Sequence, residues 1–411
     1  SGPTQKITSL TTFKPTPNGS QKHILPNITM APSITDNNVP VPDIGSASET
    51  SAAAISEAQT ISAADEVALY DRQIRLWGME AQARMRNAHI LVIIMKALSN
   101  EVSKNIVLAG VGSLTVLDPG IVTEEDLGSQ FLISEESVGL NRAEAAAPAL
   151  RRLNPRVAVN VDASDPRSKG VEFYSKFDIV IATELDLDCL LYVNDITRKC
   201  SRPFYAAASY GMYGYIFADL IKHDFIMHRE KSNMRTELKQ ETKTRSVTAV
   251  REKKDSGKTL EFVTKQELYS PLRSVVSSKV DSTWRPRRRR MVPNVLPGVK
   301  AIWAFQQAYN RLPEAKRGDF TEMTRLITEA NRDLGLPDDI VKSNFIGPFV
   351  ENATSEMAPV AAVLGGILAQ DVINVLGKRE QPLQNFLVFD GDMAATPILA
   401  LHPEGEEDSA A

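Results

Sequence analysis

The first residues that could do chemistry lie in a turn between a predicted strand and a predicted helix, in the stretch HILVIIMKALSNEVSKN (residues 89–105). In a dinucleotide-binding unit, three glycines spaced Gly-x-Gly-x-x-Gly make this turn tight and let the main chain approach the pyrophosphate. Here the three positions hold Ile94, Lys96 and Ser99. Because a side chain branched at Cβ fills the space that a phosphate needs, we predict that this turn binds no nucleotide.

Asp118 stands where such a unit carries its ribose-binding acid. It ends the next predicted strand, 24 residues after Ile94. Two interpretations remain open: a carboxylate that binds ribose, and a strand-end Asp that caps the following turn. Since the phosphate half of the site is missing, the second interpretation is favoured.

Cysteine and histidine are scarce. The only cysteines are Cys189 and Cys200, which excludes a disulfide framework and a zinc site built from cysteines. We expect two buried or half-buried free thiols. No acid–base pair is apparent among the five histidines, which together with Ile94, Lys96 and Ser99 opposes an independent nucleotide-dependent enzyme such as a dehydrogenase.

Charge is close to balanced, with a formal net charge of −4 and a pI near 5.9. Bulk attraction to nucleic acid or to an anionic membrane is therefore not expected. No run of eighteen apolar residues is present, so we predict no membrane span. The one dense cationic block, RPRRRR (285–290), has two open interpretations, a nuclear-import signal and a solvated loop.

Almost continuously apolar strands alternate with helices from residue 89 to residue 209. This pattern predicts an α/β fold with a doubly wound, mostly parallel, Rossmann-like sheet. Apolar residues recur every three or four positions over residues 66–86, which predicts one helix that Gly78 interrupts at a cost of about 1 kcal/mol. An apolar helix ends the pattern at residues 355–376, where Gly365 and Gly366 indicate close approach of another backbone, in the core or at a subunit interface.

Five blocks in this order resemble one family, the smaller subunits of SUMO-activating enzymes, in the superfamily that includes MoeB, ThiF and the ubiquitin-like activating enzymes. They are YDRQIRLWG (70–78), KNIVLAGVGSLTVLD (104–118), SQFLI (129–133), VGLNRAEAA (138–146) and SEMAPVAAVLGGILAQ (355–370). The resemblance implies a ThiF/MoeB-like adenylation fold. It also implies a larger catalytic partner that adenylates the C-terminus of SUMO with ATP and Mg²⁺ and passes it to a catalytic cysteine.

Several positions depart from the pattern of the active subunit. An active-site Asn and Arg are replaced by Gly128 and Ser129, a phosphate-binding Lys by Arg142, and the metal-binding Asp by Glu184. Arg and Lys are not interchangeable at a fitted phosphate site. We therefore predict a site with no ATP, no metal and no catalytic cysteine of its own, in which Asp118 and Arg142 remain candidates for a residual nucleotide contact.

Arg72, in the block YDRQ, is the residue that the resemblance assigns to chemistry. In relatives the equivalent arginine reaches across the subunit interface to the ATP phosphates in the partner's site, where a guanidinium stabilises charge during attack on the α-phosphorus. The alternative is a surface arginine that pairs with Asp71 or is solvated. We predict the role in trans, and assembly through the helices at 66–86 and 355–376.

The predicted organisation is a disordered tail (1–62), a first part of the adenylation-type domain (63–228), a basic insertion with a helical segment (229–345), a second part of that domain (346–403) and an acidic tail (404–411). We expect a nuclear heterodimer subunit that meets SUMO through the complex and binds no nucleic acid and no membrane. The alternatives are the corresponding subunit of a Rub-type modifier pathway and a scaffold in which Arg72 has no chemical role.

Overall fold

The computed structural model describes residues 68–231, 236–255 and 258–402 of the chain. Its centre is an eight-stranded sheet in the order β11-β10-β6-β5-β4-β1-β2-β3. The strands from β3 to β5 in this order run parallel, and β6, β10 and β11 are added antiparallel. The bounds are β1 His89–Ile93, β2 Ser113–Leu117, β3 Ala158–Asp162, β4 Ile179–Thr183, β5 Phe204–Tyr210, β6 Tyr213–Asp219, β10 Phe386–Asp390 and β11 Ile398–Leu399.

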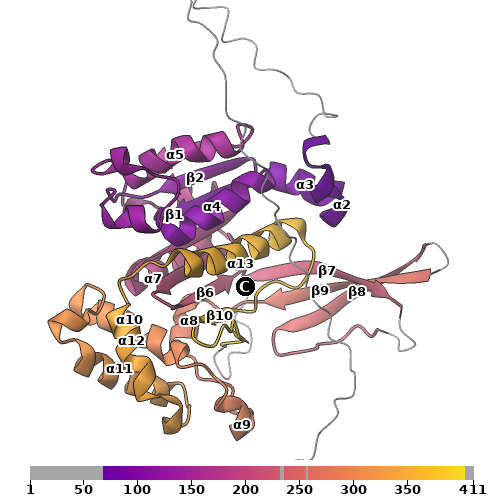
Figure 1. Ribbon diagram of the computed structural model, residues 1–411. Coiled ribbons are helices and arrows are strands. Elements are labelled where there is room, and N and C mark those ends of the chain that lie inside the picture. The colour runs from indigo at the N-terminus through magenta and orange to yellow at the C-terminus, as the bar shows by residue number, and fades with distance from the viewer. Residues whose placement is uncertain (1–67, 232–235, 256–257, 403–411) are drawn as a thin grey trace, which may run out of the picture. The chain divides into compact units, whose positions relative to one another are not determined.

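Both faces of this sheet are buried. Leu91 and Ile93 of β1 enter one apolar cluster, and Ile90 and Val92 enter a second cluster on the other face. Helices α4, α5 and α13 supply the second cluster, and α7, α10, α11 and α12 supply the first (Figure 1). The predicted doubly wound, mostly parallel α/β sheet is therefore confirmed. The helix bounds are α4 Ala97–Ala109, α5 Arg142–Leu153, α6 Val171–Tyr174, α7 Leu187–Lys199, α8 Leu272–Ser277, α10 Val295–Tyr309, α11 Phe320–Asp333, α12 Ser343–Glu351 and α13 Ala358–Gly377, with short 3-10 turns at Glu125–Gly128, Glu135–Ser137, Pro166–Ser168, Ala315–Arg317 and Asp338–Ile340.

The helix predicted over residues 66–86 is two helices, α2 (Asp71–Trp77) and α3 (Met79–Arg86). Gly78 separates them with φ 84° and ψ 160°, a conformation that ends a helix and that glycine adopts without strain. The single-helix prediction was wrong at this point. Ala81 and Met85 of α3 are buried, whereas α2 buries no residue.

The predicted basic insertion (229–345) begins within a second sheet, in the order β7-β9-β8. All three strands, β7 (Lys222–Glu230), β8 (Arg245–Asp255) and β9 (Lys258–Leu268), are antiparallel to their neighbours and extend together from the main sheet (Figure 1). The cationic block 285–290 contains a short helix, α9 (Pro286–Arg289). The sequence analysis predicted no strand at 229–297, so these strands are a feature that it missed.

The two glycines of α13 have different surroundings. A Cβ on Gly365 would lie 2.5 Å from Glu101 Cβ and 3.0 Å from the Leu98 carbonyl oxygen, both in α4. A Cβ on Gly366 would meet nothing within 4 Å. The predicted close approach is confirmed within the chain at Gly365. At Gly366 nothing in the described chain approaches, and contact at a subunit interface stays a prediction.

Helix α13 is long and apolar enough to cross a membrane, but 61% of its most apolar window is buried inside the fold. It packs mainly on α4 and also on α3, as a core helix does. The tails predicted at residues 1–62 and 404–411 lie outside the described residues.

Candidate functional site

The turn after β1 has a backbone conformation that glycine favours, although the residue at this position is Ile94. Ile94 has φ 67°, in the left-handed region that a β-branched residue rarely adopts. Its side chain is only 9% exposed and belongs to the apolar cluster below the sheet. Burial therefore holds a strained backbone in place, and the side chain takes up room beside the turn.

The other two glycine positions have structural roles at the start of α4. Lys96 is the N-cap residue, and Ser99, at the third helical position, bonds back to the Lys96 main chain. The Ser99 hydroxyl accepts a hydrogen bond from the Lys96 amide at 2.7 Å and donates to the Lys96 carbonyl at 3.0 Å. The hydroxyl thus satisfies main-chain groups that a bound ligand could otherwise contact.

Glu356 is separated from the start of α13 by Met357 alone. Its carboxylate lies at the N-terminus of α4. Its Oε2 accepts the Ala97 amide at 3.0 Å and the Ser129 hydroxyl at 3.3 Å, and its Oε1 lies 2.7 Å from Lys96 Nζ. A helix N-terminus attracts anions because its first amides are unpaired and its dipole is positive there. An internal carboxylate therefore occupies the anion position at the N-terminus of α4.

Asp118 is a second internal carboxylate beside this turn. Its carboxylate receives Arg142 in a two-pronged ion pair, with Nε–Oδ2 at 2.8 Å and Nη2–Oδ1 at 3.0 Å. The same carboxylate accepts the Met95 amide at 2.8 Å and the Gly120 amide at 2.7 Å. Asp118 is fully buried. It caps the turn that follows β2, as the favoured interpretation has it, and it also pairs with the other candidate for residual nucleotide binding.

Glu184 lies at the end of β4 with φ 53° and accepts hydrogen bonds from the amide and hydroxyl of Ser209 at 2.9 and 3.0 Å. Burial, together with the Glu356 carboxylate, raises the pKa of Glu184 to about 7, although Lys96 opposes this shift. Burial would lower the pKa of Lys96, but the charges of Glu356 and Glu184 outweigh it and raise that pKa. The five side chains therefore act on one another electrostatically, and we call Lys96, Asp118, Arg142, Glu184 and Glu356 the charge cluster.

The charge cluster does not fit a nucleotide triphosphate. Its two cations are each paired with a carboxylate at 2.7–2.8 Å. A triphosphate would add negative charge beside these carboxylates and beside Glu184, with no unpaired cation of the cluster to receive it. A Cβ at Gly120 would lie 2.2 Å from Arg142 Nη2, so that this arginine also fills the space above the turn.

The remaining predicted positions fall at or near this region. Ser129 touches the cluster through Glu356, and nothing lies within 4 Å of a Cβ built on Gly128.

Cys189 is buried and Cys200 partly buried, and both are free thiols, as expected. Burial raises the pKa of Cys189 to about 12, which disfavours the thiolate that a nucleophile requires.

Arg72 is not part of the cluster. Its side chain is exposed, and it has no hydrogen bond or ion pair with any residue that the structure describes, since Asp71 pairs with Arg75 at 2.9 Å. Gln73 beside it donates to the Leu108 carbonyl at 3.3 Å, near the C-terminal end of α4. The cluster lies at the other end of this helix, about 18 Å away at 1.5 Å per residue. Arg72 therefore lies beyond reach of its own chain's cluster.

The cationic block is partly engaged in contacts. The Arg288 guanidinium lies 3.7 Å from the centre of the Trp284 ring, and Arg290 pairs with Asp339 at 3.2 Å. Arg285 and Arg287 are exposed. Its use as a nuclear-import signal stays a prediction.

Sequence reasoning did not single out Glu356, although it lies within the quoted block SEMAP. No local pattern distinguishes it, because its partners Lys96 and Ala97 are about 260 residues earlier. The available signal was indirect: an acidic residue just before a proline-initiated helix, facing a turn whose N-cap residue is a lysine.

The sequence profile of the ThiF family matches residues 70–407, and the chain belongs to this family. It is 42% identical over 340 residues to the DNA damage tolerance protein RHC31 of Saccharomyces cerevisiae, covering 81% of this chain and 96% of the yeast protein. It is 37% identical over 347 residues to SUMO-activating enzyme subunit 1 of Rattus norvegicus, covering 83% and 95%. It is 31% identical over 338 residues to the DNA damage tolerance protein rad31 of Schizosaccharomyces pombe, covering 82% and 98%.

Proposed function

We propose that this chain is the smaller, non-catalytic subunit of a heterodimeric SUMO-activating enzyme. In this proposal the larger subunit binds ATP and Mg²⁺, adenylates the SUMO C-terminus and carries the thioester cysteine, and the present chain supports that site. The similarity over more than nine-tenths of the length of SUMO-activating enzyme subunit 1 supports the assignment. It also favours the SUMO branch over the Rub-type alternative.

The observation that carries the proposal is the carboxylate of Glu356 at the N-terminus of α4. A ThiF-family chain whose helix N-terminus is satisfied from within has no anion site to offer ATP, so any adenylation must take place on another subunit. The buried Cys189 and half-buried Cys200 supply no activated thiol, which supports placing the thioester on the partner as well.

Arg72 is the residue that we assign to the partner's site. It is exposed, unpaired within the described residues, and separated from its own cluster by the length of α4. Around it Leu69, Leu76 and Met79 are 58%, 76% and 55% exposed, an apolar surface that suits burial against another subunit. A guanidinium carried on such an interface helix could donate to the phosphates bound across it.

Only a small part of α13 is available for the predicted subunit interface. Most of this helix packs inside the chain, and Ala362 and Val363 are among its exposed positions. We therefore place the main contact on α2 and α3. Nuclear localisation stays part of the proposal, through the exposed arginines of the block 285–290.

The first experiment is ATP–pyrophosphate exchange with SUMO as the acceptor. The purified chain alone should give no exchange, and the same chain with its larger partner should give exchange that requires the partner's intact glycine turn. Robust exchange by the isolated chain would refute the assignment, because Glu356 and Asp118 would then not be closing the site.

The second experiment separates the role in trans from a scaffold role. Arg72→Ala should lower the adenylation rate of the assembled pair by at least about tenfold, or roughly 1.4 kcal/mol in the barrier, without preventing assembly. Arg75→Ala is the matched control on the same helix, because Arg75 already pairs with Asp71 within the chain. If both variants keep the parent rate, Arg72 has no chemical role and the scaffold alternative stands.

A further inference from the structure

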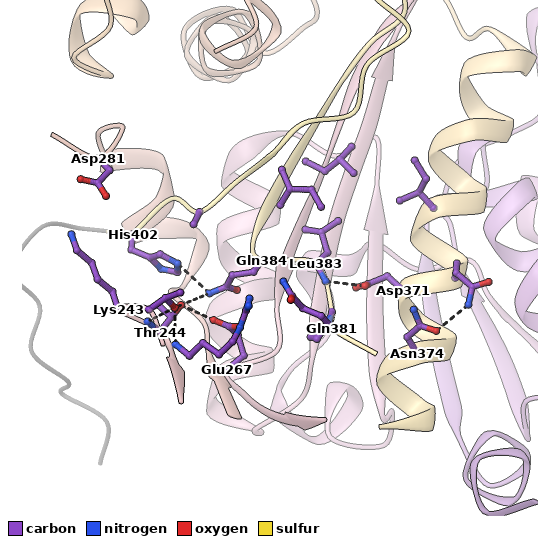
Figure 2. A pocket seen from close by; sticks show the side chains of 18 of the residues that line it. Lys243, Thr244, Glu267, Asp281, Asp371, Asn374, Gln381, Leu383, Gln384 and His402 are labelled. Carbon is purple, nitrogen blue, oxygen red and sulfur yellow. Dashed lines mark hydrogen bonds and ion pairs between the residues drawn. The ribbon is translucent and has the colours of Figure 1, made fainter. Parts of the chain in front are cut away.

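A groove unrelated to the charge cluster lies beside α13. Its volume is about 860 Å³, and it is enclosed by three segments that are far apart in the sequence. These are the turn before β8 with the end of β9, the chain from Lys279 to Arg288, and the C-terminal part from Gly366 to His402 (Figure 2). We call it the basic groove.

The floor of the basic groove is apolar and contains the edge strand β11, whose outer side pairs with no strand in the described part of the chain. Leu387, Ile398 and Ala400 line it, and Ile398 is 54% exposed. Strand β11 is the outermost strand of the main sheet, and the main chain of Leu399 faces β10. Main-chain groups alternate in direction along a strand, so those of Ala400 point outward, and they form no hydrogen bond with any described residue.

The rim of the groove carries excess positive charge. Lys243, Lys279 and Arg288 are exposed, and none forms an ion pair with a residue in the described part of the chain. By contrast, the Arg245 and Glu267 side chains neutralise each other at 2.5 Å. Three unpaired cations therefore surround an apolar floor.

The carboxylates that remain near the groove do not cancel this charge. Asp371 is turned into the protein, where it accepts hydrogen bonds from the Tyr205 hydroxyl at 2.6 Å and the Leu383 amide at 2.9 Å. Hydrogen bonds from Thr283 lower the pKa of Asp281, and Lys243 and Arg288 act on it in the same direction. The two cations thus converge on one small region of the rim, at Asp281. Of the acids that line the groove, Glu267 is paired with Arg245 and Asp371 is turned into the protein, which leaves Asp281 facing the rim.

We propose that the basic groove binds an acidic segment of a partner protein in extended conformation. Its carboxylates would meet Lys243, Lys279 and Arg288, its apolar side chains would cover Ile398 and Ala400, and its main chain would pair with Ala400 as a further strand on β11. Addition of a strand to a sheet edge provides affinity from the main chain, and charge on the rim selects the side chains. The proposal does not depend on the function proposed above.

A peptide fits this groove better than a nucleic acid. The one large aromatic ring on the rim, Trp284, is already covered by the Arg288 guanidinium at 3.7 Å and is not free to stack on a base. A free strand edge can form hydrogen bonds with the main chain of an extended peptide. Recognition of a nucleic acid by base stacking makes no use of such an edge.

The test uses the full chain and a fluorescent synthetic peptide of about twelve residues in which Asp and Glu alternate with Val and Leu. We expect saturable binding by fluorescence anisotropy at low salt, and slower hydrogen exchange at the Ala400 amide when the peptide is bound. Reversal of the rim, Lys243→Glu with Lys279→Glu and Arg288→Glu, should weaken binding by at least about tenfold. All three residues are exposed, so the fold should be retained.

A matched control reverses three exposed cations on β8, Arg251→Glu with Lys253→Glu and Lys254→Glu. It should change the affinity by less than about twofold. A peptide N-methylated at alternate residues keeps its charges and loses main-chain donors, and it should bind at least about tenfold more weakly.

Three results would overturn the proposal. They are equal loss with the rim and control reversals, equal affinity of the N-methylated peptide, and displacement by a single-stranded RNA of the same charge as effectively as by the unlabelled peptide. The last result would identify a general polyanion surface instead of a strand-pairing groove.

Discussion

Glu356→Gln is the change that most directly tests whether an internal carboxylate stabilises the N-terminus of α4. The substitution keeps the size of the side chain and an oxygen for the Ala97 amide, and it removes the charge. Glu356 lies 2.7 Å from Lys96 Nζ with side-chain exposures of 14% and 34%, so the pair is half-buried and stronger than a surface ion pair. Loss of such a pair costs about 1 kcal/mol, and loss of an anion at a helix N-terminus costs about 0.5–1 kcal/mol.

One effect opposes these losses. Glu356 raises the pKa of Glu184, so neutralising Glu356 relieves repulsion between the two carboxylates. This relief offsets a part of the loss, and the net fall in the free energy of unfolding should be about 1–2 kcal/mol at pH 7. It should be seen as a lower urea midpoint with an unchanged denaturant slope.

Two comparisons make the result specific. Glu351→Gln, at the exposed end of α12, removes the same charge without a partner in the described residues, and should stay within about 0.5 kcal/mol of the parent. Lys96→Met removes the other member of the pair. The double variant should lose less stability than the sum of the single variants by at least about 0.5 kcal/mol. Additive effects, or equal effects of Glu356→Gln and Glu351→Gln, would mean that the carboxylate does not stabilise the turn.

Two further predictions concern the pH dependence and the packing of α13. Because the pKa of Glu184 is raised to about 7 in the folded chain, the unfolded state binds fewer protons between about pH 4.5 and 7, and stability falls as pH rises through this range. Urea titrations of the parent and of Glu184→Gln at pH 5 and pH 8 should show that the parent loses roughly 2–3 kcal/mol more than the variant; parallel profiles would exclude the shift. Gly365→Ala should destabilise by about 1–3 kcal/mol because its Cβ would lie 2.5 Å from Glu101 Cβ, whereas Gly366→Ala, with open space, should stabilise by up to about 1 kcal/mol; thermal midpoints that move in the same direction would contradict this difference.

The main sheet could be predicted from the sequence because both of its faces are buried. Strands such as β1 and β4 are apolar at four consecutive positions, and this pattern depends only on neighbouring residues. Helices α4 and α5 lie within the predicted alternation of strands and helices at residues 89–209, and α10 and α11 lie within the predicted helical part of residues 229–345. The pattern of neighbouring residues was therefore enough to predict the elements that pack into the continuous core.

The sheet β7-β9-β8 could not be predicted in the same way. Its strands are rich in Lys, Arg and Glu, and their charges are balanced across the strands by pairs such as Arg229 with Glu261 at 3.0 Å and Lys258 with Glu230 at 2.5 Å. The alternation of buried His223 and Phe225 with exposed neighbours in β7 is short. Charge that is balanced between strands looks, in a single sequence, like the composition of a solvated loop.

The same distinction explains what the sequence could and could not say about the site. The replaced glycines lie close together in the chain and are visible at once, and they predict a turn that has lost its ligand. The residue that takes the ligand's place, Glu356, comes from a segment about 260 residues later and is recognised only when the fold brings it to α4. Restoring glycine at residues 94 and 96 would leave this carboxylate and the Asp118–Arg142 pair where they are. Loss of ATP binding in this chain would therefore be the combined effect of side-chain bulk at the turn and two internal anions, and reversing any one of them alone should not recreate a nucleotide site.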